Sequence, residues 1–173
     1  MTARHAIIVM GVSGAGKSTL AAALAERLGT AFLEGDQFHP PENVAAMASG
    51  QPLNDAMRAP WLRALGAAAA AELAAGRGVV VSCSALKRAY REQLRAATGG
   101  CQFLFLEAGA EALTARMQQR VAHYMPASLL GSQFAALEVP GPEEADCHKL
   151  AAELPPGEVL EAALSLTRLW QQV

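Results

Sequence analysis

The sequence has few cysteines and no long apolar run, and each shortage excludes a class of protein. Cys83, Cys101 and Cys147 are widely spaced and form no C-x-x-C pair, so neither a disulfide framework nor a zinc site is indicated. Thiols of this kind fit a reducing cytoplasm. The first apolar run, Ala6–Met10, is too short for the core of a signal peptide or for a bilayer span. We therefore expect a soluble cytoplasmic protein.

The chain also lacks an excess of charge of either sign. It has 14 Lys and Arg against 16 Asp and Glu, a net charge of −2 and a pI near 6.1. This balance gives no reason to expect nucleic acid or an anionic membrane as a partner. An anion bound by this protein must therefore be held by a local cluster of residues. The length of 173 residues fits one domain, residues 1–173, around a single core.

Short apolar runs alternate with long stretches rich in alanine and leucine. The predicted strands are Ala6–Met10, Ala31–Leu33, Val79–Val81 and Phe103–Leu106, and their lack of polar residues is typical of strands covered on both faces. The predicted helices are 17–28, 42–49, 58–75, 87–97, 109–120, 128–138 and 157–171. This alternation predicts an α/β fold, a three-layer sandwich with a central parallel sheet of about five strands.

The last strand of that sheet is the least obvious in the sequence. Cys147–Glu153 has poor β propensity. We place the strand there because Pro155, Pro156 and Gly157 then begin the final helix in a suitable way.

The first predicted strand is followed by GVSGAGKS, Gly11 to Ser18, which matches the phosphate-loop pattern G-x-x-x-x-G-K-[ST]. Glycines at this spacing let the backbone curl so that its N–H groups face phosphate oxygens, and the following helix adds its partial positive charge. Lys17 is expected to reach the β- and γ-phosphates, and the Ser18 hydroxyl to bind Mg²⁺. The alternative is a glycine-rich turn that only joins a strand to a helix.

The pattern therefore predicts a site for ATP and Mg²⁺. Its nucleotide-binding residues are expected to be Gly11, Val12, Ser13, Gly14, Ala15, Gly16, Lys17, Ser18 and Thr19.

Two other signatures of phosphate-loop proteins are missing from the chain. The third predicted strand continues into VVVSCSALK, where motors and GTPases usually carry a Walker-B acid, and no N-K-x-D guanine signature occurs. The remaining class is a small phosphotransferase, in which the enzyme holds ATP and an acceptor in line.

Asp36 follows the second predicted strand, in the segment FLEGDQFHPPEN. Ligands of α/β proteins bind at the carboxyl ends of the strands, so Asp36 is expected to accept the proton of the acceptor hydroxyl. The alternative is a cap on the helix that follows the prolines. His39 either binds the acceptor or makes a structural hydrogen bond to the loop.

Several longer motifs narrow the class further. GVSGAGKST, LEGDQFHPPENVAAMASGQPLND, the PWL segment within Arg58–Leu62, CSALKRAYR at Cys83–Arg91 and SQFAALEVP at Ser132–Pro140 together resemble the gluconate kinase family. The match runs from residue 6 to about 142 in the same order and spacing. The resemblance implies the phosphate-loop kinase fold of shikimate and nucleoside-monophosphate kinases, with a helical lid. It also implies transfer of the ATP γ-phosphate to the 6-hydroxyl of D-gluconate, and a homodimer.

An acceptor that carries one carboxylate and several hydroxyls needs cations and small polar groups in its site. Arg58, Lys87 and Arg91 are the expected cations, and Ser84 is an expected polar contact. Lys87 and Arg91 are four positions apart and would share one helical face, and arginine suits a bidentate grip on a carboxylate. The alternative for each cation is a solvated surface position.

The lid is expected at about residues 116–138, which read as two helices with a short break. The resemblance implies that Arg120 stabilises charge on the transferring phosphoryl group and that Arg116 lies near the adenine or the phosphates. His123, in the break, either helps to close the site or caps a turn. For both arginines the alternative is an exposed helix surface.

Two other functions stay open at this point. One is phosphorylation of another small hydroxylated acid, such as shikimate. The other is a nucleotide-binding or ATPase module without an acceptor.

Overall fold

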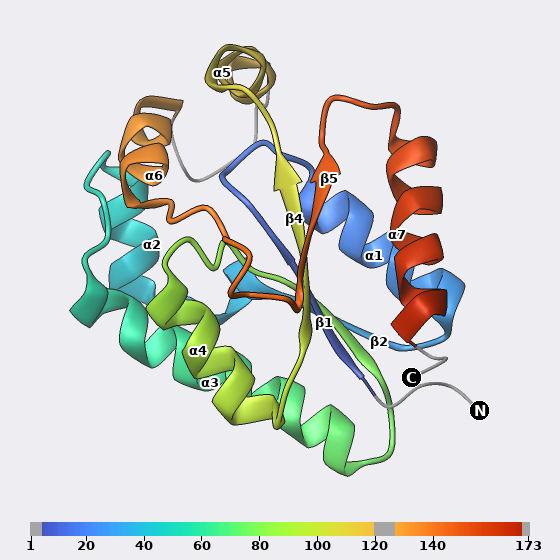
Figure 1. Ribbon diagram of the computed structural model, residues 1–173. Coiled ribbons are helices and arrows are strands. Elements are labelled where there is room, and N and C mark those ends of the chain that lie inside the picture. The colour runs from blue at the N-terminus through green and yellow to red at the C-terminus, as the bar shows by residue number, and fades with distance from the viewer. Residues whose placement is uncertain (1–4, 120–126, 171–173) are drawn as a thin grey trace.

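A parallel sheet of five strands, in the order β2-β3-β1-β4-β5, forms the centre of the protein (Figure 1). The structure is a computed structural model that describes residues 5–119 and 127–170. The strands are β1 (Ala6–Met10), β2 (Ala31–Glu34), β3 (Val79–Ser82), β4 (Gln102–Glu107) and β5 (Cys147–Ala151). Every pair of neighbouring strands is parallel. The predicted α/β fold with about five parallel strands is confirmed.

The position of each strand in the sheet explains its composition. All residues of β1 and β3 are buried, which is why β1 and the first three residues of β3 read as unbroken apolar runs. β5 pairs only with β4, and most of its side chains are partly or fully exposed. An edge strand of this kind accommodates His148 and Lys149, so the weak β propensity of the segment reflects its place at the edge.

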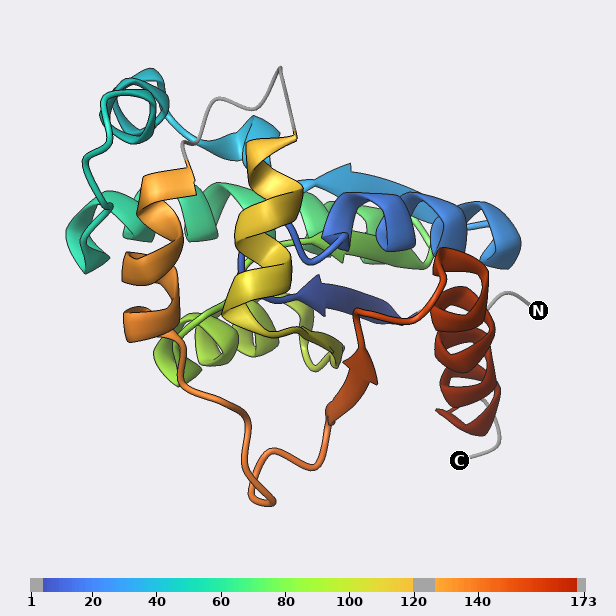
Figure 2. The same ribbon diagram turned by 90° about the horizontal axis from the view of Figure 1, so that it is seen from above.

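Helices cover both faces of the sheet, as the three-layer prediction requires. On one face α1 (Lys17–Leu28) packs against α7 (Pro156–Trp170), and on the other α3 (Asp55–Ala74) packs against α4 (Arg88–Thr98). Beyond the carboxyl ends of the strands lie the short helices α2 (Pro41–Ala48), α5 (Ala110–Gln118) and α6 (Leu130–Ala136) (Figures 1 and 2). None of the helices within the described residues is long and apolar enough to cross a bilayer.

The helix α3 begins earlier than residue 58, where the sequence predicted its start. Asn54 caps this helix, and its side chain accepts a hydrogen bond of 2.8 Å from the Met57 N–H. Capping of this kind satisfies an N–H group that has no partner within the helix. Arg58 therefore lies in the first turn of α3, one turn before Trp61.

Candidate active site

The loop between β1 and α1 has the backbone that a phosphate loop requires. Gly14 and Gly16 have φ angles of 82° and 97°, a region that favours glycine because it has no Cβ atom. Gly16 is the N-cap of α1, and no side chain caps the helix there. This is expected where an anion takes the place of a capping side chain. The Lys17 Nζ atom donates to the Val12 carbonyl at 3.2 Å, which folds the lysine over its own loop.

The segment that carries Asp36 is fastened to the adjacent strand β3. Gly35 donates from its N–H to the Ser82 Oγ at 3.1 Å, and its carbonyl accepts from the Trp61 Nε1 at 2.8 Å. Ser82 in turn donates to the Glu34 carboxylate at 2.6 Å. These bonds hold the backbone before Asp36 at the carboxyl edge of the sheet. The N-cap of α2 is Pro40, without a side-chain bond, so Asp36 does not cap that helix.

The sequence left two roles open for His39, a contact with the acceptor and a structural hydrogen bond, and its surroundings suit both. Its ring stacks on Trp61, with centroids 4.1 Å apart, and its Nδ1 lies 3.3 Å from the Asn43 amide nitrogen. Asn43 also donates to the Met57 carbonyl, so its nitrogen is the donor, Nδ1 of His39 is the acceptor, and Nε2 carries the proton. The pKa of His39 is lowered to about 4, mainly by burial, with nearby Asp36 opposing this shift and Arg58 adding to it. The ring is therefore neutral at pH 7.

Arg58 is a buried cation without a counter-ion among the described residues. Its side chain lies over the Tyr90 ring, 5.5 Å from the centroid, and the residue is only 8% exposed. The Nε atom is buried without a hydrogen-bond partner in the part of the chain that the structure describes. Because an unpaired buried charge is costly, this arrangement indicates a position where a ligand supplies the negative charge.

These groups meet in one cavity. It is lined by the phosphate loop with the start of α1, by the segments that follow β2 and β3, and by residues of α2, α3 and α6. The lining residues are Ser13, Gly14, Gly16, Lys17, Ser18, Asp36, His39, Met47, Leu53, Arg58, Trp61, Ser84 and Gln133. The predicted acceptor residues Asp36, His39, Arg58 and Ser84 thus lie with the predicted phosphate-binding residues. The described residues hold no cluster of three or more His, Cys, Asp or Glu suited to a metal.

Trp61 and Gln133 line this cavity although the sequence did not single them out. Gln133 reaches it from α6, and its Oε1 accepts a 2.8 Å hydrogen bond from the Ser13 N–H of the phosphate loop. Trp61 lies inside the PWL motif and Gln133 inside the SQFAALEVP motif, so these motifs were the signal in the sequence that could have marked both residues as part of the site. What the sequence could not provide is the contact between residues 120 positions apart.

A second cavity lies behind the phosphate loop and is mainly apolar. Its lining includes Ala15, Gly16, Thr19, Arg116 and Leu154, and Gly16 also lines the first cavity. Arg116 donates to the Ala152 carbonyl at 3.2 Å. The two cavities are therefore neighbours along the loop.

Arg91 is a predicted acceptor residue that the structure places away from the cavity. It is 0% exposed, and its guanidinium binds the Glu144 carboxylate and the carbonyls of Ala85, Leu86 and Glu138. The prediction that Arg91 contacts the acceptor is wrong because every donor of its side chain is used inside the protein.

Lys87 does not line the cavity either. It is the N-cap of α4, with an extended backbone, so it does not share a helical face with Arg91 as the spacing suggested. Its Nζ pairs with Asp55 at 2.9 Å. Arg120 and His123 lie outside the described residues, and their roles stay predictions.

Comparison with known proteins agrees with this arrangement. A family model described as an AAA domain matches residues 7–140. Shikimate kinase from Aquifex aeolicus vf5 has the same fold, with a TM-score of 0.60 over 92% of this chain and 94% of its own, at 18% identity. The fold and the phosphate loop together define a nucleotide-binding protein of the phosphate-loop class.

Nearer relatives define the family. Gluconokinase from Gluconobacter oxydans (strain 621H) is 50% identical over 155 residues, which is 90% of this chain and 86% of the relative. The crystal structure of a gluconokinase from Sinorhizobium meliloti 1021 has a TM-score of 0.85 at 45% identity, covering 98% of this chain and 95% of its own. The chain belongs to the gluconokinase family and is an ATP-dependent kinase.

Proposed function

We propose that this protein transfers the γ-phosphate of ATP to the 6-hydroxyl of D-gluconate and releases 6-phospho-D-gluconate. The observation that carries the proposal is the shared cavity, in which Asp36 and Arg58, whose Nε has no hydrogen-bond partner among the described residues, lie with Lys17 and Ser18 of the phosphate loop. A carboxylate, a cation without a counter-ion in the described part of the chain, and a phosphate site are groups that suit phosphorylation of a small polyol acid.

On the acceptor side, Arg58 is proposed to bind the gluconate carboxylate. The guanidinium offers paired donors that match a carboxylate, and the bound anion supplies the charge that Arg58 lacks within the described chain. His39 is proposed to donate from Nε2 to a substrate hydroxyl, because its Nδ1 accepts from Asn43. Ser84 lines the same cavity and offers a small hydroxyl.

In the transfer step, the 6-hydroxyl oxygen forms a bond to the γ-phosphorus while the bond between this phosphorus and the β–γ bridging oxygen breaks. Asp36 accepts the hydroxyl proton, and Lys17 with the main-chain N–H groups of the loop stabilises the charge on the phosphates. The Ser18 hydroxyl and the Asp36 carboxylate line one cavity, an oxygen set that suits Mg²⁺ bound through phosphates and water. Bound Mg²⁺ would supply charge neutralisation between the β- and γ-phosphates.

The second cavity is proposed to hold the adenine. Its apolar lining beside Gly16 and Thr19 suits a purine base, and Arg116 would then lie along the base or the ribose. Arg120 is proposed to stabilise the transferring phosphoryl group, and His123 to help to close the site. The homodimer and the cytoplasmic location stay predictions, and sedimentation of the purified protein tests the first.

The test is ADP release, coupled to NADH oxidation, measured against a panel of D-gluconate, shikimate, other sugar acids and no acceptor. We expect release to depend on D-gluconate, with 6-phospho-D-gluconate as the product identified by mass spectrometry. Preference for shikimate or another acid would replace the proposed acceptor. Equal release with and without every acceptor would indicate an ATPase module and contradict the proposal.

A further inference from the structure

The turn after β3 holds a backbone conformation that its sequence does not favour. Ala85 has a φ angle of 44°, and it is the only non-glycine residue with positive φ within residues 5–119 and 127–170. An alanine keeps this conformation only where its surroundings enforce it. The residue before it, Ser84, lines the acceptor cavity and accepts a hydrogen bond from the Gly11 N–H through its carbonyl at 3.3 Å. The conformation of this turn therefore fixes two positions: that of Ser84 in the acceptor cavity and that of Gly11 at the start of the phosphate loop.

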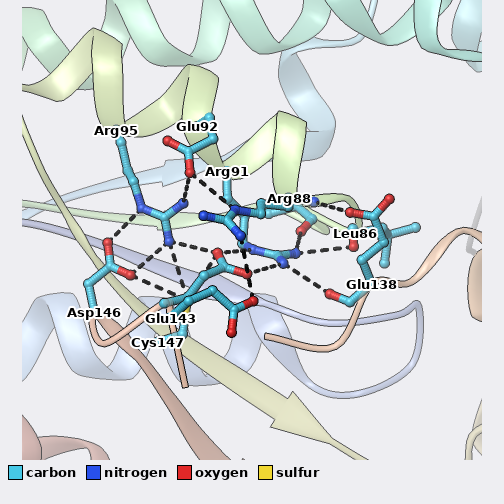
Figure 3. A network of polar contacts seen from close by, with 11 residues as sticks. Leu86, Arg88, Arg91, Glu92, Arg95, Glu138, Glu143, Asp146 and Cys147 are labelled. Atoms are coloured by element: carbon cyan, nitrogen blue, oxygen red, sulfur yellow. Dashed lines mark hydrogen bonds and ion pairs between the residues drawn. The ribbon is translucent and has the colours of Figure 1, made fainter. Parts of the chain in front are cut away.

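The buried Arg91 side chain enforces that turn. Its Nη1 donates to the carbonyls of Ala85 at 2.9 Å and Leu86 at 3.1 Å (Figure 3). Its Nε and Nη2 bind the two oxygens of Glu144 at 2.8 and 2.6 Å, and Nη2 also donates to the Glu138 carbonyl at 3.0 Å. Glu144 balances the charge, which allows a guanidinium to remain fully buried. The guanidinium thus has five contacts with four residues, three of them to main-chain carbonyls.

The same turn is bound to the chain that leaves α6. The Glu138 N–H donates to the Leu86 carbonyl at 2.8 Å, and the Glu138 carboxylate accepts from the Arg88 N–H at 2.8 Å, at the start of α4. Arg91 therefore joins two segments that both reach the acceptor cavity: the turn with Ser84, and α6 with Gln133.

We propose that Arg91 is a positioning residue for the acceptor, acting through the Ser84–Leu86 turn and held in place by Glu144. The inference rests on the proposed function in naming the acceptor. A single ammonium group cannot replace Arg91, because the geometry requires a planar cation with donors on several sides at once. Arg91 therefore affects the reaction without touching the substrate.

The network of ion pairs around Glu144 also contains Arg95, which offers a matched control. Arg95 binds Glu144 at 2.8 Å and Asp146 at 2.6 Å, but no atom of the turn. Arg91→Lys and Arg95→Lys each keep the charge and remove part of the hydrogen bonding. A merely structural role for the network predicts similar effects of both changes on the catalytic constants.

The experiment measures the KM for D-gluconate and for ATP in both variants, together with amide hydrogen exchange of the peptides that cover residues 83–88 and 136–140. We expect Arg91→Lys to raise the KM for gluconate by about tenfold or more, to leave the KM for ATP within about twofold, and to speed exchange in both peptides. Arg95→Lys is expected to leave both KM values and both peptides unchanged. If Arg91→Lys does not fold, Glu144→Gln, which keeps the side-chain shape and weakens the grip on Arg91, replaces it.

A double mutant tests whether the effect passes through the turn. In a Ser84→Ala background, Arg91→Lys is expected to raise the gluconate KM by much less than in the wild type, because the group that it positions is gone. Equal effects in both backgrounds, equal effects of Arg91→Lys and Arg95→Lys, or faster exchange with an unchanged gluconate KM would each overturn the inference. Absence of wild-type turnover with gluconate would refute the proposed substrate instead, and the exchange data alone would then decide whether Arg91 holds the turn.

Discussion

Gly35 directly follows β2 and lies against Ser82 at the end of β3, and the structure leaves no space for a side chain there. A Cβ atom at this position would lie 2.1 Å from the Ser82 carbonyl oxygen and 3.2 Å from its carbonyl carbon, whereas ordinary contacts begin near 3.4 Å. Both neighbours are main-chain atoms of a buried strand, so no side chain can move aside. Gly35→Ala must therefore displace the end of β2, and Asp36 with it, by about 1 Å or more.

The cost of this displacement can be worked out in two parts. Overpacking of a tight site typically destabilises a protein by about 1–3 kcal/mol. Loss or weakening of the bond from Trp61 to the Gly35 carbonyl, now 2.8 Å long, adds about 1 kcal/mol. The sum remains below the usual free energy of unfolding, roughly 5–15 kcal/mol, so the variant is expected to fold. A 1 Å misplacement of a reacting group lowers turnover by about a hundredfold.

The assay combines urea unfolding with steady-state kinetics for gluconate and ATP. Gly131→Ala is the matched control, because a Cβ atom there meets nothing within 4 Å and the backbone φ is not positive. We expect Gly35→Ala to lower kcat and to leave the KM for ATP unchanged. Gly131→Ala is expected to have the stability and the kinetic constants of the wild type. Wild-type stability and turnover in Gly35→Ala would refute the claim that this contact places Asp36.

Three further changes test the acceptor side of the cavity. Arg58→Leu should raise the gluconate KM by about a hundredfold without lowering the urea midpoint, because the buried cation has no described partner; a lower midpoint or an unchanged KM would contradict this. Trp61→Phe keeps a ring against His39 but leaves the Gly35 carbonyl unpaired, so unfolding should cost about 1–3 kcal/mol less; an equal free energy of unfolding would count against it. The folded pKa of His39 is about 4 against 6.5 in the unfolded chain, so the unfolded state binds a proton first and stability is lost as pH falls from 6.5 to 4. His39→Gln should flatten urea midpoints measured over that range, and an unchanged slope would argue against the burial of a neutral ring.

The sequence predicted those parts of the fold that local patterns determine. Ala6–Met10 is an unbroken apolar run and forms β1 with the same ends. The phosphate loop is also local, since GVSGAGKS contains both its glycines and its lysine, and the structure builds it between β1 and α1. The last strand was predicted within Cys147–Glu153 from the helix that follows it, because its own residues reflect an edge position; the observed β5 is Cys147–Ala151.

The composition of the site depends on contacts that no local pattern contains. Arg58 and Arg91 both lie in quoted motifs, yet Arg58 lines the cavity and Arg91 is turned inward to Glu144. The difference arises because Glu144 approaches from a segment 53 positions away. Gln133 was missed for the same reason, since its contact with Ser13 forms only when α6 folds back over the phosphate loop.

The most direct test of the account is Asp36→Asn, measured as turnover with saturating gluconate and as ATP affinity by isothermal titration. The change keeps the size of the side chain and removes its capacity to accept a proton, and general bases typically contribute about 10²–10⁴-fold. The account predicts a loss of kcat in that range with ATP affinity unchanged. Turnover within about twofold of the wild type would contradict it, because the acceptor hydroxyl would then need no base at this position.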